Sequence, residues 1–207
     1  MTRTAALGIG DEVVGVPAHI GLFYDAEPER RQRRLEFLRP AIEDRRQGIM
    51  LLAPPGIADS ALRQLEADLG GSLKDDVRRG RVVVAHYDKD PDLLLENIRG
   101  ALDTLAAAGH DVVRLFAQVA WGAEGFPFPE DHLWAESRLN DVLAGTSVIC
   151  ACAYDVSELP DRALISGGLE THPSVVIGGR LTESPNYLTP PEYMRSFLRN
   201  ARSGAGL

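Results

Sequence analysis

The chain has 207 residues, and the 44% that are hydrophobic supply enough apolar surface for one domain with its own core. Its formal net charge of -8 excludes a general nucleic-acid-binding surface, because such a surface needs a basic face to neutralise phosphates. No stretch approaches the roughly 18 apolar residues that span a bilayer, and the first residues contain no apolar leader segment. We therefore expect a cytoplasmic protein that binds neither DNA nor a membrane.

Short apolar runs alternate with longer amphipathic segments along the chain. Residues 1–16 show no clear periodicity, which predicts a loose lead-in. The apolar runs predict strands at residues 17–24, 49–53, 81–86, 112–120, 147–153 and 174–177. The segments between them predict helices at residues 25–47, 57–69, 91–108, 131–143, 157–167 and 191–202, with a frayed end at 203–207. This alternation predicts a three-layer α/β fold, in which a mainly parallel sheet has helices on both faces.

The residues that follow the predicted strands are rich in aromatic and ionisable side chains. Ligands of parallel α/β sheets bind beyond the carboxyl ends of the strands, so this rim is the candidate site. It comprises Tyr24-Asp25, Ala53-Pro54, His86-Tyr87-Asp88, Trp121, Tyr154-Asp155 and Gly178-Gly179-Arg180. Two alternatives stay open, because Asp155 is also placed to cap a helix near Ser157 and the glycine pair is also typical of a simple tight turn.

The residue patterns of common catalytic sites are missing from the sequence. The loop after the first predicted strand carries three carboxylates, Asp25, Glu27 and Glu29, and no glycine, so it would repel phosphate. There is no GxGxxG at a strand-to-helix turn and no GxSxG. The five histidines form no HxH or HxxxH pair, so a metal site would have to be assembled from distant segments. We expect no enzyme activity, no cofactor and no metal.

Two histidines and two cysteines have plainer interpretations. His19 lies one residue before Ile20 and His172 two residues before Ser174, which places both near the amino edge of the sheet. Hydrogen bonds to loop carbonyls are their favoured role. Cys150 and Cys152 lie two residues apart in one predicted strand, so they share a face and cannot easily form a disulfide with each other. Buried reduced thiols are the favoured interpretation, and a redox or metal-binding pair is the alternative.

Four segments resemble, in chain order, the motifs of the MEDS domain, the methanogen/methylotroph DcmR sensory domain. They are HIGLFYDAEPE, AQVAWGAEG, CAYD and HPSVVIGGRLTESPNYLTPPEY, and the resemblance covers residues 17–193, leaving 194–207 as a helix end and tail. It implies a RecA/KaiC-like fold with decayed Walker motifs and a non-catalytic sensory module for small organic molecules such as hydrocarbon derivatives. The motif positions carried over are His19, Phe23, Tyr24, Trp121, Tyr154, Asp155, His172, Pro173, Gly178, Gly179, Arg180, Asn186 or its neighbour Pro185, and Tyr187. Where the family often has a glutamate before the tryptophan motif, this chain has Gln118, which would remove a charge from the pocket.

Together these observations predict a sensory protein that binds a small, largely apolar or aromatic ligand at the rim. The candidate ligand-binding residues are Tyr24, Trp121, Gln118, Tyr154, Asp155, Gly178, Gly179, Arg180, Tyr187, His19 and His172. Of these, Tyr24, Trp121 and Tyr154 would form the apolar walls. Arg180 and Asp155 would orient polar groups of the ligand. Ligand binding is expected to shift the loop at residues 122–130.

Family members look coupled to DNA-binding, histidine-kinase or anti-sigma-factor-type domains, and no such segment fits outside the matched residues. We therefore expect the signal to leave through a separate partner, a kinase, an anti-sigma factor or a transcription regulator. The alternative is a partner-switching interaction protein without a small ligand, whose docking face is the helix with seven arginines between Arg30 and Arg46, although a solvated helix surface is the commoner use of such a pattern. A residual NTP-dependent enzyme is the least favoured hypothesis. RecA-like ancestry also permits a homo-oligomer.

Overall fold

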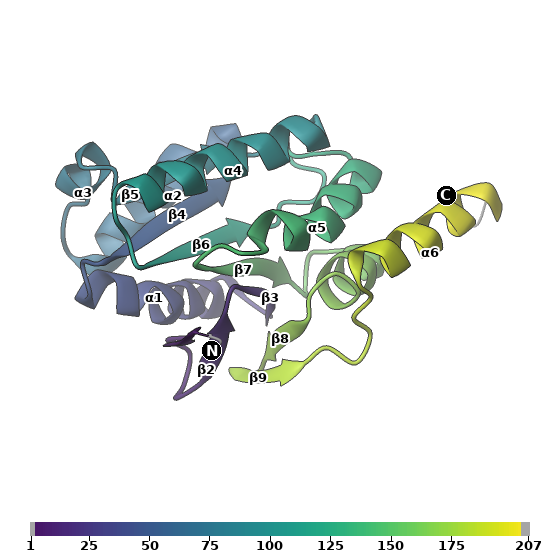
Figure 1. Cartoon of the computed structure of the whole chain (residues 1–207), viewed down its shortest axis with the longest axis horizontal. Coiled ribbons are helices and arrows are strands. Elements are labelled where there is room, and N and C mark those ends of the chain that lie inside the picture. Colours follow the sequence, from purple (N-terminus) through teal and green to yellow (C-terminus); the bar gives the residue numbers. More distant parts are fainter. Residues whose placement is uncertain (1–2, 204–207) are drawn as a thin grey trace.

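Seven strands form one twisted sheet at the centre of the molecule (Figure 1). The structure is a computed structural model that describes residues 3–203, without the side chains of residues 55–59 and 200–203. The strand order is β5-β4-β6-β7-β3-β8-β9, and every neighbouring pair in it is parallel except the β8–β9 hairpin. The strands are β3 (Ala18–Tyr24), β4 (Gln47–Ala53), β5 (Val82–His86), β6 (Val112–Gln118), β7 (Val148–Asp155), β8 (Ser174–Ile177) and β9 (Arg180–Glu183). The predicted mainly parallel α/β sheet is confirmed.

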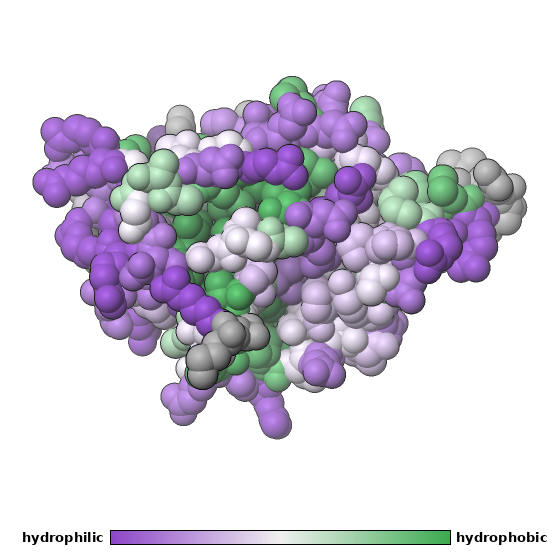
Figure 2. Space-filling view, viewed as in Figure 1, coloured by the Kyte–Doolittle hydropathy of each residue, from purple (hydrophilic) through white to green (hydrophobic). Residues whose placement is uncertain are grey.

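Helices cover both faces of this sheet and enclose two apolar cores. One face carries α1 (Glu27–Glu43), α2 (Pro55–Leu69) and the short α3 (Lys74–Arg78), and the other carries α4 (Pro91–Ala107), α5 (Pro129–Leu143) and the π-helix η1 (Ala163–Leu169). The central strands are nearly continuous apolar runs because both of their faces are buried. Figure 2 shows hydrophilic side chains over the outer helices and hydrophobic ones in the spaces between them. No described helix is long and apolar enough to cross a membrane.

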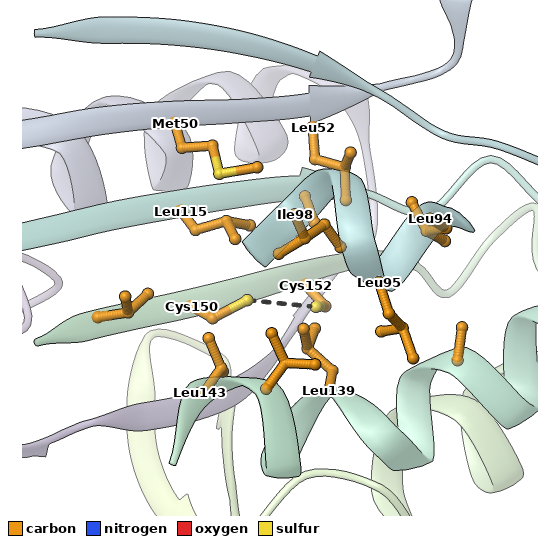
Figure 3. Packing of buried hydrophobic residues seen from close by; sticks show 14 of the residues in the cluster. Met50, Leu52, Leu94, Leu95, Ile98, Leu115, Leu139, Leu143, Cys150 and Cys152 are labelled. Carbon is orange, nitrogen blue, oxygen red and sulfur yellow. Dashed lines mark hydrogen bonds between the residues drawn. The ribbon is translucent and has the colours of Figure 1, made fainter. Parts of the chain in front are cut away.

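Strand alternation decides which side chains of β3 and β7 face each helical layer. Ile20, Leu22 and Tyr24 of β3 pack in the core beneath α1, whereas Phe23 packs in the core beneath α4 and α5. Since successive side chains of a strand point to opposite faces, His19 shares the α5 side with Phe23. On β7 the side chains of Cys150, Cys152 and Tyr154 belong to the same side, and Figure 3 shows both sulfurs directed toward α4 and α5.

The loose lead-in predicted for residues 1–16 is wrong over the described part of that segment. Residues Arg3–Ala6 (β1) and Val13–Val16 (β2) form an antiparallel hairpin. The hairpin is ordered because Leu7 and Ile9 are buried against the α1-side core. In addition, the buried guanidinium of Arg114 donates hydrogen bonds to the carbonyls of Ala6 and Leu7.

The C-terminal third of the chain also differs in detail from the predicted elements. The helix predicted at residues 157–167 is displaced toward the C-terminus as η1, and β9 was not predicted. Earlier in the chain, the short α3 was not predicted either. The last helix, α6 (Pro190–Ser203), contacts α5 and projects away from the sheet (Figure 1). Of the frayed end predicted at 203–207, residues 204–207 lie outside the described residues.

Candidate functional site

A pocket of about 610 Å³ lies beyond the carboxyl ends of β3, β6 and β7. We call it the rim pocket, and it is formed by the loops that follow these three strands. The chain leaves β3 toward α1 on one face of the sheet and leaves β6 toward α5 on the opposite face. The rim pocket therefore lies at a topological switch point, where parallel α/β sheets bind their ligands.

Four of the predicted site residues line the rim pocket. They are Tyr24 from β3, Gln118 and Trp121 from the end of β6 and the loop after it, and Asp155 from the end of β7. The rest of the lining mixes polar or charged residues with small or apolar ones. The polar or charged residues are Asp25, Glu27, Arg30, Ser157 and Glu158, and the others are Ala26, Val119, Ala120, Gly122, Ala123 and Leu159. The strand-end rule thus brings together residues that are up to 131 positions apart in the sequence, from Tyr24 to Asp155.

The loop after β6 connects the rim pocket with the protein interior. Trp121 packs edge-to-face on the ring of His132, with the ring centroids 5.6 Å apart. Phe126 of the same loop is buried between His132 and Tyr87, at centroid distances of 4.8 and 4.5 Å. The Nε2 atom of His132 in turn lies 4.0 Å from a carboxylate oxygen of Glu136. A displacement of Trp121 would therefore change the packing around His132 on α5.

Three other predicted residues meet in a second, buried group beneath α5. The rings of His19 and His172 lie 4.0 Å apart, and the Tyr154 ring packs edge-to-face on His172 at 5.7 Å. Tyr154 donates a hydrogen bond to Oε1 of Glu136 over 3.2 Å. Both imidazoles also face this oxygen, at 3.5 Å from His19 and 3.0 Å from His172. These residues lie inside the protein and not at the rim where the ligand was expected.

Sequence reasoning missed Glu136, the residue at the centre of this buried group. A signal for it was present, because Glu136, Leu139 and Leu143 follow the spacing i, i+3, i+7 on α5 and so share the buried face of the helix. A carboxylate in phase with core leucines needs a buried partner. The three histidines around it come from β3, α5 and the segment before β8.

The sequence profile of the MEDS family, described as the methanogen/methylotroph, DcmR sensory domain, matches residues 18–173 of the chain. The chain belongs to the MEDS family. The match includes all described residues of the rim pocket and of the buried group, but it ends before the segment 174–193. No curated protein matches the chain. The family assigns this MEDS domain a sensory or regulatory role.

The fold of the MEDS domain is similar to that of a KaiC-like protein from the hyperthermophilic archaeon Pyrococcus horikoshii OT3, known from its crystal structure. The TM-score is 0.54 at 13% sequence identity, and the similarity covers 76% of this chain and 70% of the archaeal chain. This likeness confirms the RecA/KaiC-like fold.

The rim pocket of the MEDS domain is acidic. Its lining contains the carboxylates of Asp25, Glu27, Asp155 and Glu158 but only one guanidinium, that of Arg30, which forms an ion pair with Glu27. Only two residues connect β3 with α1, and acidic side chains occupy the first turn of that helix. Carboxylates at a helix N-terminus occupy the position where a phosphate would bind. The lining therefore favours a neutral or cationic molecule over a phosphate.

The phenol of Tyr24 supplies a hydrogen-bond donor to the rim pocket. Burial raises the pKa of Tyr24 to about 12, although the nearby Arg30 lowers it. The hydroxyl therefore stays protonated at neutral pH. The Oδ1 atom of Asp155 accepts hydrogen bonds from the backbone amide and the hydroxyl of Ser157, at 2.9 and 2.6 Å. Asp155 thus orders the turn after β7 and also lines the pocket, but it does not cap a helix near Ser157, because residues 156–158 form a turn.

The buried group balances its charges internally. Burial opposes ionisation of Glu136, but His172 and His19 hold the pKa of this carboxyl well below its usual range. Burial also opposes charging of His19, yet Cys152 and Glu136 raise its pKa to about 10. Burial and the nearby His19 lower the pKa of His172 to about 4. With no further charge in the group, these shifts would pair one imidazolium with one carboxylate and leave the second imidazole neutral.

The remaining predicted residues lie apart from the rim pocket. Gly178 and Gly179 form the turn between β8 and β9 with φ values of 57° and 77°, which suit glycine. This turn packs on the guanidinium of Arg33 of α1, 2.9 Å from where a Cβ at Gly179 would lie. Arg180 is exposed, and Tyr187 is half-buried in the segment between β9 and α6. Within the described part of the chain, none of these residues lines the rim pocket, and the turn interpretation accounts for the glycine pair.

Proposed function

We propose that this MEDS domain is a non-catalytic sensor that binds a small organic molecule in the rim pocket and signals to a separate regulatory protein. The proposal is carried by one observation, a pocket at the topological switch point whose walls combine Tyr24 and Trp121 with an excess of carboxylates. Its volume of about 610 Å³ lies in the range of small-molecule sites, about 300–1,000 Å³. The family's sensory role supports this assignment.

The lining specifies the class of ligand. Aromatic side chains offer apolar walls, and the carboxylates accept hydrogen bonds from hydroxyl or ammonium groups. We infer a neutral or cationic hydrocarbon derivative, such as an alcohol or an amine. The acidic lining and the two-residue connection between β3 and α1 argue against a nucleotide.

The loop after β6 is the element through which binding would act. Trp121 contacts both the rim pocket and His132, so a ligand that displaces its indole changes the packing on α5. Such a ligand shifts the population of loop conformations only if it binds one of them more tightly than the others. We propose that the partner, a kinase, an anti-sigma factor or a transcription regulator, binds the conformation stabilised by the ligand.

Tryptophan fluorescence tests this proposal. The chain has two tryptophans, so Trp134→Phe leaves Trp121 as the only reporter. Titration with short-chain alcohols, primary amines and benzyl alcohol should give a saturable change with at least one probe class, whereas phosphate and Mg-ATP should give none. In this background, Ala26→Phe places a ring at the rim pocket and should abolish the change, and the same substitution at the exposed Ala106 of α4 should preserve it.

Three results would contradict the proposal. They are no response to any probe, a response that survives Ala26→Phe, and ATP hydrolysis by the purified protein, which would revive the enzyme hypothesis.

A further inference from the structure

Four side chains with metal-binding atoms converge inside the protein, from four different segments. They are His19 of β3, Glu136 of α5, Cys152 of β7 and His172, which precedes β8. All four are buried, and their donor atoms lie within 4.8 Å of one another. Oε1 of Glu136 is 3.0 Å from Nε2 of His172 and 3.5 Å from Nε2 of His19. The same Nε2 atom of His19 is 3.5 Å from the Cys152 sulfur. Ligand atoms of a tetrahedral zinc ion, bound at about 2.0–2.3 Å, lie about 3.2–3.8 Å apart.

The second ring nitrogen of each histidine has the partner expected of a metal ligand. Nδ2 of Asn140 donates to the carbonyl of Thr171 over 2.8 Å, which leaves its Oδ1 atom facing Nδ1 of His19 at 3.2 Å. This Nδ1 must therefore carry the proton. Metal-binding histidines typically donate their other N–H to a carbonyl, a carboxylate or water, which fixes the tautomer. With Nδ1 protonated, neutral His19 presents the lone pair of Nε2 to Glu136 and Cys152.

His172 is fixed in the same way. Its Nδ1 atom lies 3.1 Å from the carbonyl of Gly167. The Thr171 hydroxyl, 3.0 Å from this nitrogen, donates its own hydrogen to the same carbonyl and can only accept. Nδ1 of His172 is therefore a donor. Among the described residues its Nε2 atom has no hydrogen-bond partner, although a Glu136 oxygen lies 3.0 Å away.

The charges of the four side chains suit a divalent cation. A Cys152 thiolate and a Glu136 carboxylate contribute two negative charges, and two neutral imidazoles contribute none. A divalent ion makes the group neutral overall, which matters because the site adjoins the apolar side chains of Leu95 and Leu139 (Figure 3). Thiolate and imidazole ligands favour zinc over magnesium or calcium, which prefer oxygen ligands.

We propose that His19, Glu136, Cys152 and His172 bind one divalent cation of the zinc class, with Zn²⁺ as the expected ion. The ion would join β3, β7, α5 and the segment before β8, and the proposal does not rest on ligand binding in the rim pocket. A cavity of about 360 Å³ at the amino ends of β3 and β8 is lined by His19, Asn140 and Pro173, and it offers a route to the site from the surface. The alternative is a metal-free group stabilised by hydrogen bonds and by an ion pair between an imidazolium of His19 and the carboxylate of Glu136.

Cobalt binding to the full chain distinguishes the metal site from the metal-free ion pair. After treatment with a chelator, the protein should bind one equivalent of Co²⁺ with a thiolate-to-cobalt charge-transfer band, and Zn²⁺ should displace it. Cys152→Ser should abolish the band, whereas Cys150→Ser should keep it, because Cys150 is a buried thiol on the same face of β7 but outside the four-residue group. Cys152→Ser should also weaken Zn²⁺ binding by more than about 100-fold, since loss of an outer-shell partner alone costs about 10–100-fold.

The cobalt spectrum of the wild-type protein tests the metal site by itself. The proposal therefore remains testable even if a variant fails to fold. Circular dichroism of the metal-free variants shows whether they fold. Absence of Co²⁺ binding by folded wild-type protein, Co²⁺ binding without a thiolate band, or a band that persists in Cys152→Ser would each overturn the metal site. None of these results bears on ligand binding in the rim pocket.

Discussion

Replacing Asp76 by asparagine should destabilise the domain by removing one partner of a buried ion pair. Asp76 accepts hydrogen bonds from Nε and Nη2 of Arg81 at 3.0 and 2.8 Å. The two residues are only 7% and 6% exposed. Arg81 also donates to the carbonyl of Ala41 over 2.7 Å, which ties the start of β5 to α1. In Asp76→Asn this guanidinium stays buried without its counter-charge, apart from the contacts it makes to carbonyls.

The size of the effect follows from the burial of the pair. Removing one partner of a buried ion pair costs about 3–5 kcal/mol of unfolding free energy. In a domain of about this size, 1 kcal/mol lowers the melting temperature by about 2–4 °C, so Asp76→Asn should lower it by about 6–20 °C. The matched control is Asp75→Asn in the same helix, where the carboxylate pairs with Arg78 and both side chains are mostly exposed, 66% and 75%. An exposed pair contributes about 0–1 kcal/mol.

The pH dependence of this difference has a defined sign. Hydrogen bonds from Arg81 hold the pKa of Asp76 below its usual value, despite the opposing effect of burial. The stabilisation is therefore complete above the unfolded-state pKa of about 3.9 and is lost as the pH falls through the folded-state pKa. Thermal unfolding followed by circular dichroism should show a gap between wild type and Asp76→Asn that is full at pH 7 and shrinks in acid. A gap below about 1 kcal/mol at pH 7, or one that persists in acid, would refute the reasoning.

Three further substitutions have defined outcomes. A Cβ at Gly168 would lie 2.5 Å from the Phe23 ring, so Gly168→Ala should cost about 1–3 kcal/mol in urea unfolding, and an unchanged midpoint would show that the ring yields freely. Asn140→Ala removes the acceptor that fixes His19 and should weaken Zn²⁺ binding about 10–100-fold in a chelator competition, whereas equal affinity would contradict the tautomer assignment. Arg114→Ala removes the guanidinium that donates to the carbonyls of Ala6, Leu7 and Phe37 and should cost more than about 3 kcal/mol in the same urea assay. A loss below about 1 kcal/mol would argue against this role.

The sheet could be predicted because each of its buried parallel strands is an apolar run with a clear end. The periodicity of α4 likewise predicted its buried stripe, and Leu94, Ile98, Leu102 and Leu105 are all buried. The hairpin at residues 3–16 could not be predicted, because its apolar residues become ordered only by packing on the α1-side core. The helix expected from Ser157 begins only after Pro160, since proline disfavours a helical conformation in the residue before it.

The rim pocket and the buried group differ in how much sequence signal they leave. Tyr24, Trp121 and Asp155 each follow or end a predicted strand, so one topological rule brings them to the same edge. This rule does not predict the contact between His19 and His172, which are 153 positions apart in the sequence and meet beneath α5. A site assembled from four separate segments has no short spacing motif. Its members can be recognised only when strand phase and helix phase are combined.

Native mass spectrometry of the protein purified from its own host tests ligand binding in the rim pocket most directly. Wild-type protein should carry a small organic mass under native conditions that is released on denaturation. The Ala26→Phe variant, whose added ring occupies the pocket, should lack this mass, and the Ala106→Phe control should retain it. Wild-type protein without any organic mass, or the same mass on Ala26→Phe, would contradict the assignment of the rim pocket as the sensor site.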